Sequence, residues 1–268
     1  MMTLSTLGGM RNYRGTNVII TGASSGLGAE FAARFAARGA GVILVARRED
    51  RLRDLAQKLE RRHGVGAVPL ALDLGRPDAA AQLRGMLDER GIRVQSLLNN
   101  AGFGAKGAFI DSDPERMQQM VALNIATLVS LTREFLPDLV ASGDGVLVNL
   151  ASTAAYQPVP SMAVYAASKA FVLSFTESIA YETRGTGLGV LALSPGPTRT
   201  EFFDVVGETV ATVGGFETAD EVVTRALHEL DRAHPRASVV SGRMNAIQAR
   251  LVGMLPRRLA LNVSGRIA

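Results

Sequence analysis

The sequence predicts an α/β fold: a doubly wound parallel sheet in a single domain, residues 1–268, that ends in a helical tail. Three observations support this prediction. Short β-branched segments alternate with longer amphipathic segments along the chain. The short segments are apolar at nearly every position, which is typical of strands covered on both faces. Neither a Pro/Gly/Ser-rich linker nor an internal repeat divides the chain.

The first four units each consist of an apolar strand followed by a segment with apolar residues at helical spacing. The predicted pairs are "NVIIT" (17–21) with a helix at 26–38, "GVILVA" (41–46) with 48–63, "AVPLALD" (67–73) with 76–90, and "VQSLLNN" (94–100) with 114–139.

The same rhythm continues to the C-terminus. "GVLVNLAS" (145–152) precedes a helix at 162–184, and "LGVLALS" (187–194) precedes a loop and a helix at 218–233. A short strand, "ASVVS" (237–241), leads into the helical tail, 243–268. In such sheets the ligand crevice lies beyond the carboxyl ends of the strands. The candidate residues below follow strands or open the next helices, so we expect them to meet there.

The composition excludes several classes of function. The 268 residues include no cysteine, which excludes disulfides and thiolate chemistry and suits a reducing compartment. The net charge is +4, but the basic residues are interspersed with acids, as in "RREDRLRDLAQKLERRH", so we expect no nucleic-acid partner. The start lacks a signal-peptide pattern, and no apolar run approaches the roughly 18 residues of a transmembrane helix. We therefore expect a soluble, cytoplasmic protein, and we predict no metal site.

The segment "TGASSGLG" (21–28) admits two interpretations. Its core fits G-x-S-x-G, the elbow that presents a serine nucleophile, here Ser24. A hydrolase would also need an earlier oxyanion strand and a suitable histidine. The turn follows the first strand, and two of the three histidines, His228 and His234, lie in or at the end of a helical segment.

The same segment is also a glycine-rich turn between a strand and a helix, which can hold a pyrophosphate at the helix N-terminus. In this interpretation Gly22 allows the tight turn and Gly26 allows backbone amides to approach the phosphates. Gly28 lets the helix pack closely on the sheet, and Ser24 and Ser25 become phosphate-contacting or capping hydroxyls. The sequence favours this interpretation.

"YAASK" places Tyr165 and Lys169 four residues apart, on one face of a predicted helix. A phenol has a pKa near 10, and an adjacent ammonium favours the phenolate. We therefore expect Lys169 to lower the pKa of Tyr165 toward the working pH of an acid–base catalyst. Ser152, at the end of the fifth predicted strand, is placed to hydrogen-bond a substrate oxygen.

Together these motifs resemble the short-chain dehydrogenase/reductase family, in its single-domain branch. The resemblance covers residues 15 to about 242, with the motifs in the family's order. "TGASSGLG" matches the cofactor turn, "NNAG" (99–102) the segment beside the adenine, and "PGPTRT" (195–200) the loop that holds the nicotinamide carboxamide. The family's four catalytic residues correspond to Asn124, Ser152, Tyr165 and Lys169 in this sequence. The implied cofactor contacts are Gly22, Ser24, Ser25, Gly26, Leu27, Gly28, Arg47, Arg48, Asp73, Leu74, Asn100, Ala101, Gly102, Tyr165, Lys169, Pro195, Gly196 and Thr198.

The resemblance implies a hydride transfer between nicotinamide and a carbonyl or secondary alcohol. Ser152 would orient the carbonyl oxygen, and Tyr165 would donate a proton to it. Lys169 would bind the nicotinamide ribose, and Asn124 would hold a water that relays protons to Lys169. Asp73 would lie near the adenine amino group. Asn124 could instead cap its helix or bond backbone within it, and Asp73 could simply end a strand.

The segment after the second strand bears on the form of the cofactor. NAD-preferring dinucleotide folds usually carry an acid there, which bonds the ribose hydroxyls. In "VILVARRED" that position is Ala46, followed by Arg47 and Arg48. A guanidinium can hold a 2′-phosphate through charge-assisted hydrogen bonds. We therefore predict NADP(H).

The expected substrate is a lipophilic carbonyl or alcohol, because the loops around the crevice carry mostly apolar side chains. We predict substrate contacts from Phe103, Ser152, Tyr156, Tyr165 and Phe202. Further apolar candidates for the wall are Phe109, Val159, Met162 and Phe203. The "NNAGFGAKGAF" segment resembles hydroxysteroid-dehydrogenase-like and long-chain carbonyl reductases. A separate segment, 201–216, contains glycines that can act as hinges (Gly207, Gly214 and Gly215) and apolar side chains (Phe202, Phe203 and Val205), so we predict that it closes over the substrate.

Two alternatives remain beside this interpretation: a dinucleotide-sensing regulator without catalysis, and an epimerase or dehydratase of the same family. The intact Tyr165–Lys169 pair disfavours the first, and the compact C-terminal part disfavours the second. The resemblance also implies a homodimer or homotetramer. The tail, 243–268, departs from the common family ending and could cover the pocket, join an oligomer interface or touch a membrane surface.

Overall fold

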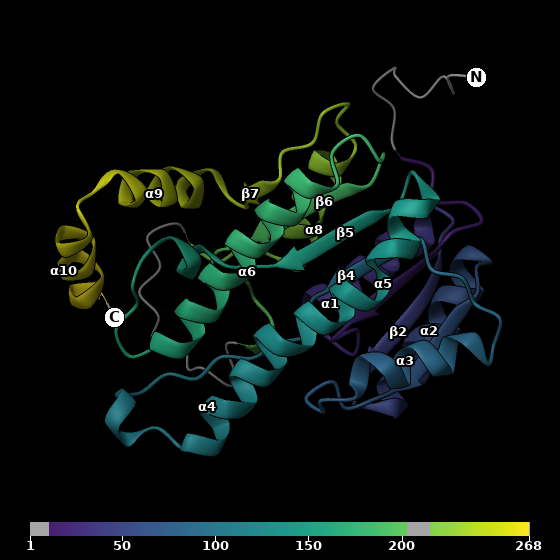
Figure 1. Ribbon diagram of the computed structural model, residues 1–268, viewed down its shortest axis with the longest axis horizontal. Helices are drawn as coiled ribbons and strands as arrows, with labels where there is room; N and C mark the ends of the chain where they lie inside the picture. Colours follow the sequence, from purple (N-terminus) through teal and green to yellow (C-terminus); the bar gives the residue numbers. More distant parts are fainter. Residues whose placement is uncertain (1–10, 203–214, 268) are drawn as a thin grey trace.

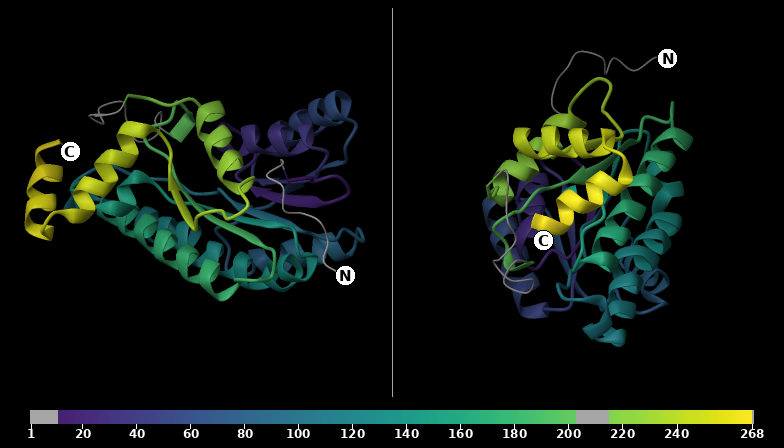
Figure 2. Two further views of the ribbon diagram at one scale, coloured as in Figure 1. Left: turned by 90° about the horizontal axis from the view of Figure 1, so that it is seen from above. Right: turned by 90° about the vertical axis from the view of Figure 1, so that its left-hand side faces the viewer.

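The computed structural model describes residues 11–202 and 215–267. Its centre is a seven-stranded parallel sheet with helices on both faces (Figures 1 and 2). The predicted fold class is therefore confirmed. The strands are β1 (Asn17–Thr21), β2 (Gly41–Ala46), β3 (Ala67–Ala71), β4 (Ser96–Asn99), β5 (Val146–Leu150), β6 (Gly189–Ser194) and β7 (Ser238–Val240).

The strand order, β3-β2-β1-β4-β5-β6-β7, is that of a Rossmann-type sheet extended by one strand. The order reverses between β1 and β4, where Val18 of β1 is paired with Val42 of β2 on one side and Ser96 of β4 on the other. Chain segments that leave β1 and β4 diverge to opposite faces of the sheet. A crevice therefore opens beyond the carboxyl ends of these two strands.

Alternate residues of each strand feed two separate cores. On one face Val18 and Ile20 of β1 pack with helices α1 (Gly26–Ala37), α2 (Glu49–His63) and α8 (Ala219–Leu230). On the other face Ile19 packs with α3 (Ala79–Asp88) and α5 (Leu128–Ser142), and the long helix α6 (Ala163–Glu182) lies beside them. The two layers of helices are seen from above in Figure 2. Burial on both faces explains why the strands lack polar alternation.

The segment predicted as one helix over 114–139 is divided. It begins as α4 (Pro114–Val121), where the Asp113 side chain accepts a hydrogen bond from the amide of Glu115 and Pro114 occupies the first helical turn. A π-helical turn, Ala122–Thr127, then joins α4 to α5. Such turns insert a residue into the helix and often occur at functional sites. This turn carries Asn124.

The predicted helical tail forms two helices, α9 (Arg243–Met254) and α10 (Arg257–Ile267). They extend from the end of β7 past the carboxyl edge of the sheet (Figure 1). Within residues 11–202 and 215–267, no helix is long and apolar enough to cross a membrane.

Candidate active site

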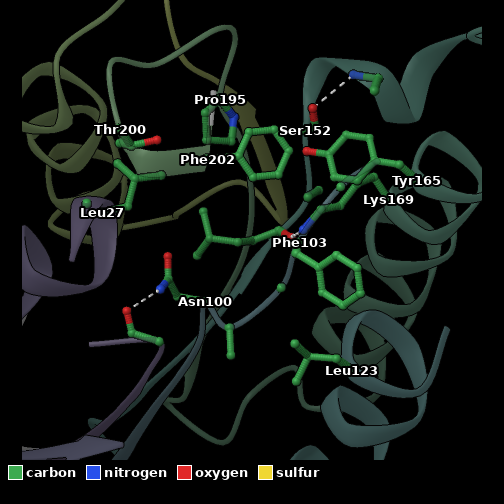
Figure 3. A pocket seen from close by; sticks show the side chains of 18 of the residues that line it. Leu27, Asn100, Phe103, Leu123, Ser152, Tyr165, Lys169, Pro195, Thr200 and Phe202 are labelled. Atoms are coloured by element: carbon green, nitrogen blue, oxygen red, sulfur yellow. Dashed lines mark hydrogen bonds between the residues drawn. The ribbon is translucent and has the colours of Figure 1, made fainter. Parts of the chain in front are cut away.

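A cavity of about 1120 Å³ lies at the carboxyl edge of the sheet (Figure 3). Loops that follow β1 to β6 line it, together with residues of α4 and α9. Pockets for a single drug-sized ligand usually occupy about 300–1,000 Å³. This cavity therefore has room for a dinucleotide beside a small substrate.

The glycine-rich turn forms one end of the cavity. Gly22 and Gly26 adopt positive φ values of 65° and 54°, which favour glycine. A Cβ at Gly28 would lie 2.4 Å from the carbonyl oxygen of Gly22, and a Cβ at Gly22 would lie 2.7 Å from Nδ2 of Asn100. Side chains would therefore fill or displace this cradle. Its shape, at the N-terminus of α1, fits the pyrophosphate of a dinucleotide.

Gly28 itself does not line the cavity, unlike Gly22, Ser24, Ser25, Gly26 and Leu27. Its contact with Gly22 is the close helix–strand packing that the sequence predicts. Asn100 holds the other side of the turn, because its Nδ2 donates to the carbonyl oxygen of Thr21 at 2.9 Å. The backbone amides of Asn100 and Ala101 donate to the Thr21 hydroxyl. The turn and the "NNAG" segment are thus one bonded unit.

Arg48 points into the glycine-rich turn from the start of α2. Its Nη2 donates to the hydroxyls of Ser24 and Ser25, each at 2.9 Å, and its Nε donates to Ser24 at 3.2 Å. Arg47 also borders the cavity, and it forms no ion pair with any other described residue. Ser24 therefore lies beside a guanidinium at the glycine-rich turn, an environment that fits the predicted phosphate-contacting hydroxyl.

The end of the cavity that is predicted to hold the adenine is built from the loop after β3. Asp73 and Leu74 both line it, and Oδ1 of Asp73 accepts a hydrogen bond from the amide of Gly75 at 3.0 Å. β3 ends at Ala71, two residues earlier than predicted, so Asp73 belongs to this loop. One carboxylate oxygen is held by the turn, and the residue stays at the edge of the cavity.

Tyr165, Lys169 and Ser152 meet at the centre of the cavity, as the sequence predicts. Tyr165 and Lys169 lie in consecutive turns of α6 and are each 8% exposed. The Ser152 hydroxyl lies beside the Tyr165 phenol (Figure 3) and accepts a hydrogen bond from the amide of Ala154 at 3.1 Å. Lys169 Nζ donates to the carbonyl oxygen of Leu150 at 2.7 Å. A phenol, a hydroxyl and an ammonium thus converge where a carbonyl oxygen can bind.

The expected lowering of the Tyr165 pKa by Lys169 is wrong for this structure. Burial raises the pKa of Tyr165 to about 12, although the Ser152 hydroxyl acts in the opposite direction. Burial also lowers the pKa of Lys169 to about 8. Desolvation disfavours both charged forms, and this effect exceeds the attraction between ammonium and phenolate. At neutral pH Tyr165 therefore keeps its proton, the form required of a proton donor.

Asn124 lies just behind these residues and does not line the cavity itself. Its Oδ1 accepts from the amide of Phe103 at 3.1 Å, and its Nδ2 donates to the Phe103 carbonyl at 3.0 Å and to the Ser168 hydroxyl at 3.1 Å. A Cβ at Gly102 would lie 2.9 Å from Asn124 Oδ1 and 3.7 Å from Lys169 Nζ. Asn124 therefore fixes the loop after β4 against α6, next to Lys169.

The loop after β6 borders the cavity opposite α6. Pro195, Gly196 and Thr198 line it, and the Thr198 hydroxyl donates to the Gly196 carbonyl at 2.9 Å. Glu217 holds this loop in place. Its backbone forms an isolated β-bridge with that of Thr198, and its carboxylate accepts a hydrogen bond from Asn245 Nδ2 at 3.1 Å. A Cβ at Gly196 would collide with Asn245. The first helix of the tail thus supports the predicted nicotinamide loop.

The predicted substrate wall is mostly apolar and mostly in place. Phe103, Tyr156, Val159, Met162 and Phe202 line the cavity. The Phe202 ring lies 5.4 Å from that of Tyr165, at an interplanar angle of 44° (Figure 3). Burial raises the pKa of Tyr156, whose hydroxyl lies 3.4 Å from that of Ser194.

One expectation for this wall is wrong, and another lies outside the described residues. Phe109 is 68% exposed in a 3-10 turn and lies away from the cavity, because the loop after β4 carries it outward before α4 begins. Residues 203–214, which include Phe203 and most of the predicted closing segment 201–216, are outside the described part of the chain. Glu201 and Phe202 are described, and both line the cavity.

The sequence analysis missed two sets of cavity residues, which come from helices and not from strand ends. They are Arg116 and Gln119 of α4 with Leu123 of the π-helical turn, and Asn245, Gln248, Ala249 and Val252 of α9. The α9 residues repeat at helical spacing, but nothing in the sequence placed that helix against the sheet edge. The tail thus covers part of the pocket, one of its three predicted roles.

Comparison with known proteins agrees with this geometry. Residues 16–211 match the family model described as short chain dehydrogenase. The chain is 39% identical over 210 residues to sulfoacetaldehyde reductase 2 of Chromohalobacter salexigens, which covers 78% of this chain and 80% of that protein.

Two solved structures share the fold over nearly the whole chain. A short-chain dehydrogenase from Sphingobium yanoikuyae in complex with NADPH aligns with a TM-score of 0.78 and 35% identity, over 92% of this chain and 95% of that one. A 7β-hydroxysteroid dehydrogenase aligns with a TM-score of 0.84 and 26% identity, over 96% and 100%. The chain belongs to the short-chain dehydrogenase/reductase family, oxidoreductases that act on alcohol and carbonyl groups with a nicotinamide cofactor.

Proposed function

We propose that this protein is an NADP(H)-dependent reductase of lipophilic ketones or aldehydes, which also oxidises the corresponding alcohols. The observation that carries the proposal is the buried Tyr165 phenol, which keeps its proton beside Ser152 and Lys169 in an apolar cavity. A phenol in this state can protonate a carbonyl oxygen, and few other groups in the cavity can.

Each catalytic side chain has a distinct role in this proposal. Bound nicotinamide supplies the hydride for reduction and accepts it for oxidation. Ser152 donates a hydrogen bond that orients the carbonyl oxygen, and Tyr165 passes its proton to that oxygen. Lys169 leaves part of its hydrogen-bonding capacity for the nicotinamide ribose, because an ammonium has three donors and Leu150 accepts one. Asn124 positions the loop beside Lys169 and, as the family resemblance implies, holds a water that relays protons to it.

The preference for NADP(H) rests on the end of β2. Ala46 stands where an acid would bond the ribose hydroxyls, and Arg47 and Arg48 border the same part of the cavity. The relative from Sphingobium yanoikuyae, solved with NADPH, supports this choice. Arg47→Ala and Arg48→Ala should each weaken NADPH binding by about 1.5–3 kcal/mol. NADH binding should change less, because NADH lacks the 2′-phosphate.

Arg53→Ala is the matched control for these variants. Arg53 lies on α2, shortly after Arg47 and Arg48; it is paired with Glu49 at 2.6 Å and does not border the cavity. Wild-type protein that binds NADH as tightly as NADPH would contradict the proposed preference.

The lipophilic substrate class rests on the apolar wall formed by Phe103, Val159, Met162, Phe202 and Val252. A second candidate is a small anionic aldehyde, as the name of the relative sulfoacetaldehyde reductase 2 suggests. The observation that favours it is Arg116, which borders the cavity above the Phe103 ring, 5.4 Å from its centre, and has no acidic partner among the described residues.

A panel of carbonyl compounds with NADPH separates these candidates. Bulky aliphatic and aromatic ketones should be reduced with higher kcat/KM than sulfonated or carboxylated aldehydes, and Arg116→Gln should leave their reduction intact. Preferential use of the anionic aldehydes, lost in Arg116→Gln, would select the second candidate. Absence of NADPH oxidation, combined with tight NADPH binding, would instead point to a sensing role.

We also propose a homodimer or homotetramer in the cytoplasm. Large apolar side chains are exposed on α6 and on the tail, among them Tyr181, Ile247 and Leu251. Such side chains commonly mark surfaces that become buried on association. Light scattering coupled to gel filtration measures the assembly, and a monomer at micromolar concentration would contradict this part of the proposal.

A further inference from the structure

Glu201 links the segment after β6 to the start of α2 by ion pairs. It follows directly after the loop of Pro195–Thr200, and its carboxylate reaches across to α2. Oε2 lies 2.9 Å from Nη2 of Arg48, and Oε1 lies 2.5 Å from Nη1 of Arg51. Hydrogen bonds from Arg51 and Arg48 lower the pKa of Glu201 to about 2, so this carboxylate is charged throughout the physiological range.

The edge of the Arg48 guanidinium formed by Nε and Nη2 also donates hydrogen bonds to the glycine-rich turn. Its Nη2 has three oxygens at 2.9 Å, from Ser24, Ser25 and Glu201, although this nitrogen carries only two hydrogens. Nε is shared with Ser24 as well. The edge that would hold a phosphate in a forked arrangement is therefore already occupied by a carboxylate and two hydroxyls.

We propose that Glu201 limits the affinity of this protein for NADP(H) by competing with the 2′-phosphate for Arg48, and so moderates its preference for that cofactor over NAD(H). The inference rests on the proposed role of Arg47 and Arg48 as phosphate ligands. A phosphate monoester carries about −1.5 to −2 charges at pH 7, so it is repelled by the ionised Glu201 that shares its cation. Arg47, exposed and free of ion pairs with other described residues, remains for the phosphate.

The position of the loop makes this competition direct. Thr200 lies so close to the turn that a Cβ at Gly26 would be 3.2 Å from its side chain. Glu201 is thereby held over the phosphate end of the cavity, and both it and Arg48 line that cavity. The two side chains are 45% and 40% exposed, so water screens their interaction, and we expect a moderate effect.

The test is direct titration of NADPH and NADH into wild type and Glu201→Gln, followed by the fluorescence of the reduced nicotinamide. Glutamine keeps the size and removes the charge, and the site is too exposed for the change to disturb the core. We expect NADPH to bind about two- to fivefold more tightly to the variant, the range of an exposed ion pair, with NADH unchanged. Arg48→Ala added to Glu201→Gln should abolish the gain.

Glu134→Gln is the matched control. Glu134 lies on α5 and is paired with Arg84 of α3 at 2.9 Å. It is partly exposed and lies away from the cavity. This variant has the same change in net charge and should bind both cofactors as wild type does.

Three results would overturn the inference. Unchanged NADPH affinity in Glu201→Gln would make the ion pair a passive surface feature. Weaker binding of both cofactors would mean that the ion pair helps to hold the cleft closed over either cofactor. An equal gain in affinity for both would mean that Glu201 acts on the pyrophosphate, which the two cofactors share. If wild type binds NADPH and NADH equally tightly, the proposed preference for NADP(H) is contradicted. The inference about Glu201 is still tested in that case, because the change in affinity that Glu201→Gln causes is measured separately for each cofactor.

Discussion

The packing of Gly28 against the glycine-rich turn permits a sharp test of the cofactor cradle. In Gly28→Ala the new Cβ would lie 2.4 Å from the Gly22 carbonyl oxygen, 2.7 Å from Asn100 Nδ2 and 2.9 Å from the Gly22 carbonyl carbon. Two of these three contacts are with backbone, which cannot rotate away as a flexible side chain can. The turn between β1 and α1 must therefore move.

The magnitude follows from two opposing effects. Overpacking of a close contact destabilises by about 1–3 kcal/mol. Alanine in a helix gains roughly 0.5–1 kcal/mol over glycine. Gly85, inside α3, has nothing within 4 Å of its Cβ position, so Gly85→Ala should show the helical gain alone. We expect Gly28→Ala to be about 1–3 kcal/mol less stable than Gly85→Ala, after both effects are counted.

The assay combines urea denaturation of both variants with titration of NADPH. Gly85→Ala should bind NADPH as wild type does, whereas Gly28→Ala should lose most of its affinity, because the displaced turn no longer presents its amides to the phosphates. If Gly28→Ala is as stable as Gly85→Ala and binds NADPH normally, the turn is not the rigid cradle described above.

Two further predictions concern burial in the catalytic cavity. Burial lowers the pKa of Lys169 from 10.5 to about 8, so between these values the folded state binds fewer protons than the unfolded state and stability rises with pH. The measured quantity is the difference in free energy of unfolding between wild type and Lys169→Met, from urea denaturation. This difference should increase in favour of wild type by about 2 kcal/mol from pH 8 to pH 10. A difference that stays constant over this range would mean that Lys169 is well solvated. Phe202→Ala removes the ring beside Tyr165 and should lower kcat/KM for bulky ketones about tenfold. Phe109→Ala, at an exposed position outside the cavity, is its control and should change nothing, and equal values for the two variants would remove Phe202 from the substrate wall.

Local signals in the sequence were enough to predict the sheet and the centre of the site. Strands such as β1 and β5 are buried on both faces, so their continuous apolar pattern is unambiguous. The Tyr165–Lys169 spacing predicts a shared helix face because α-helical geometry alone determines it. Gly22 and Gly26 are required by their own positive φ values, and Gly28 is required by its close contact with the carbonyl group of nearby Gly22. These features depend on short-range geometry.

Features that depend on tertiary packing were not predictable in this way. The π-helical turn at Asn124 arises where α4 and α5 must meet both the loop after β4 and α6, and no residue in "ALNIAT" marks it. The pKa of Tyr165 depends on how completely the fold desolvates it, which its helical spacing from Lys169 does not reveal. Arg51, too, looks like a solvated residue of α2 until Glu201, 150 positions away, is brought beside it.

The proton-donor role of Tyr165 is the central claim, and Tyr165→Phe tests it most directly. The substitution removes only the hydroxyl, so NADPH should bind as it does to wild type. The rate of NADPH oxidation with the best ketone or aldehyde of the panel should fall by roughly 10²–10⁴, the usual contribution of a general acid. Turnover at the wild-type rate, with NADPH binding retained, would contradict the account, because the proton would then come from another group.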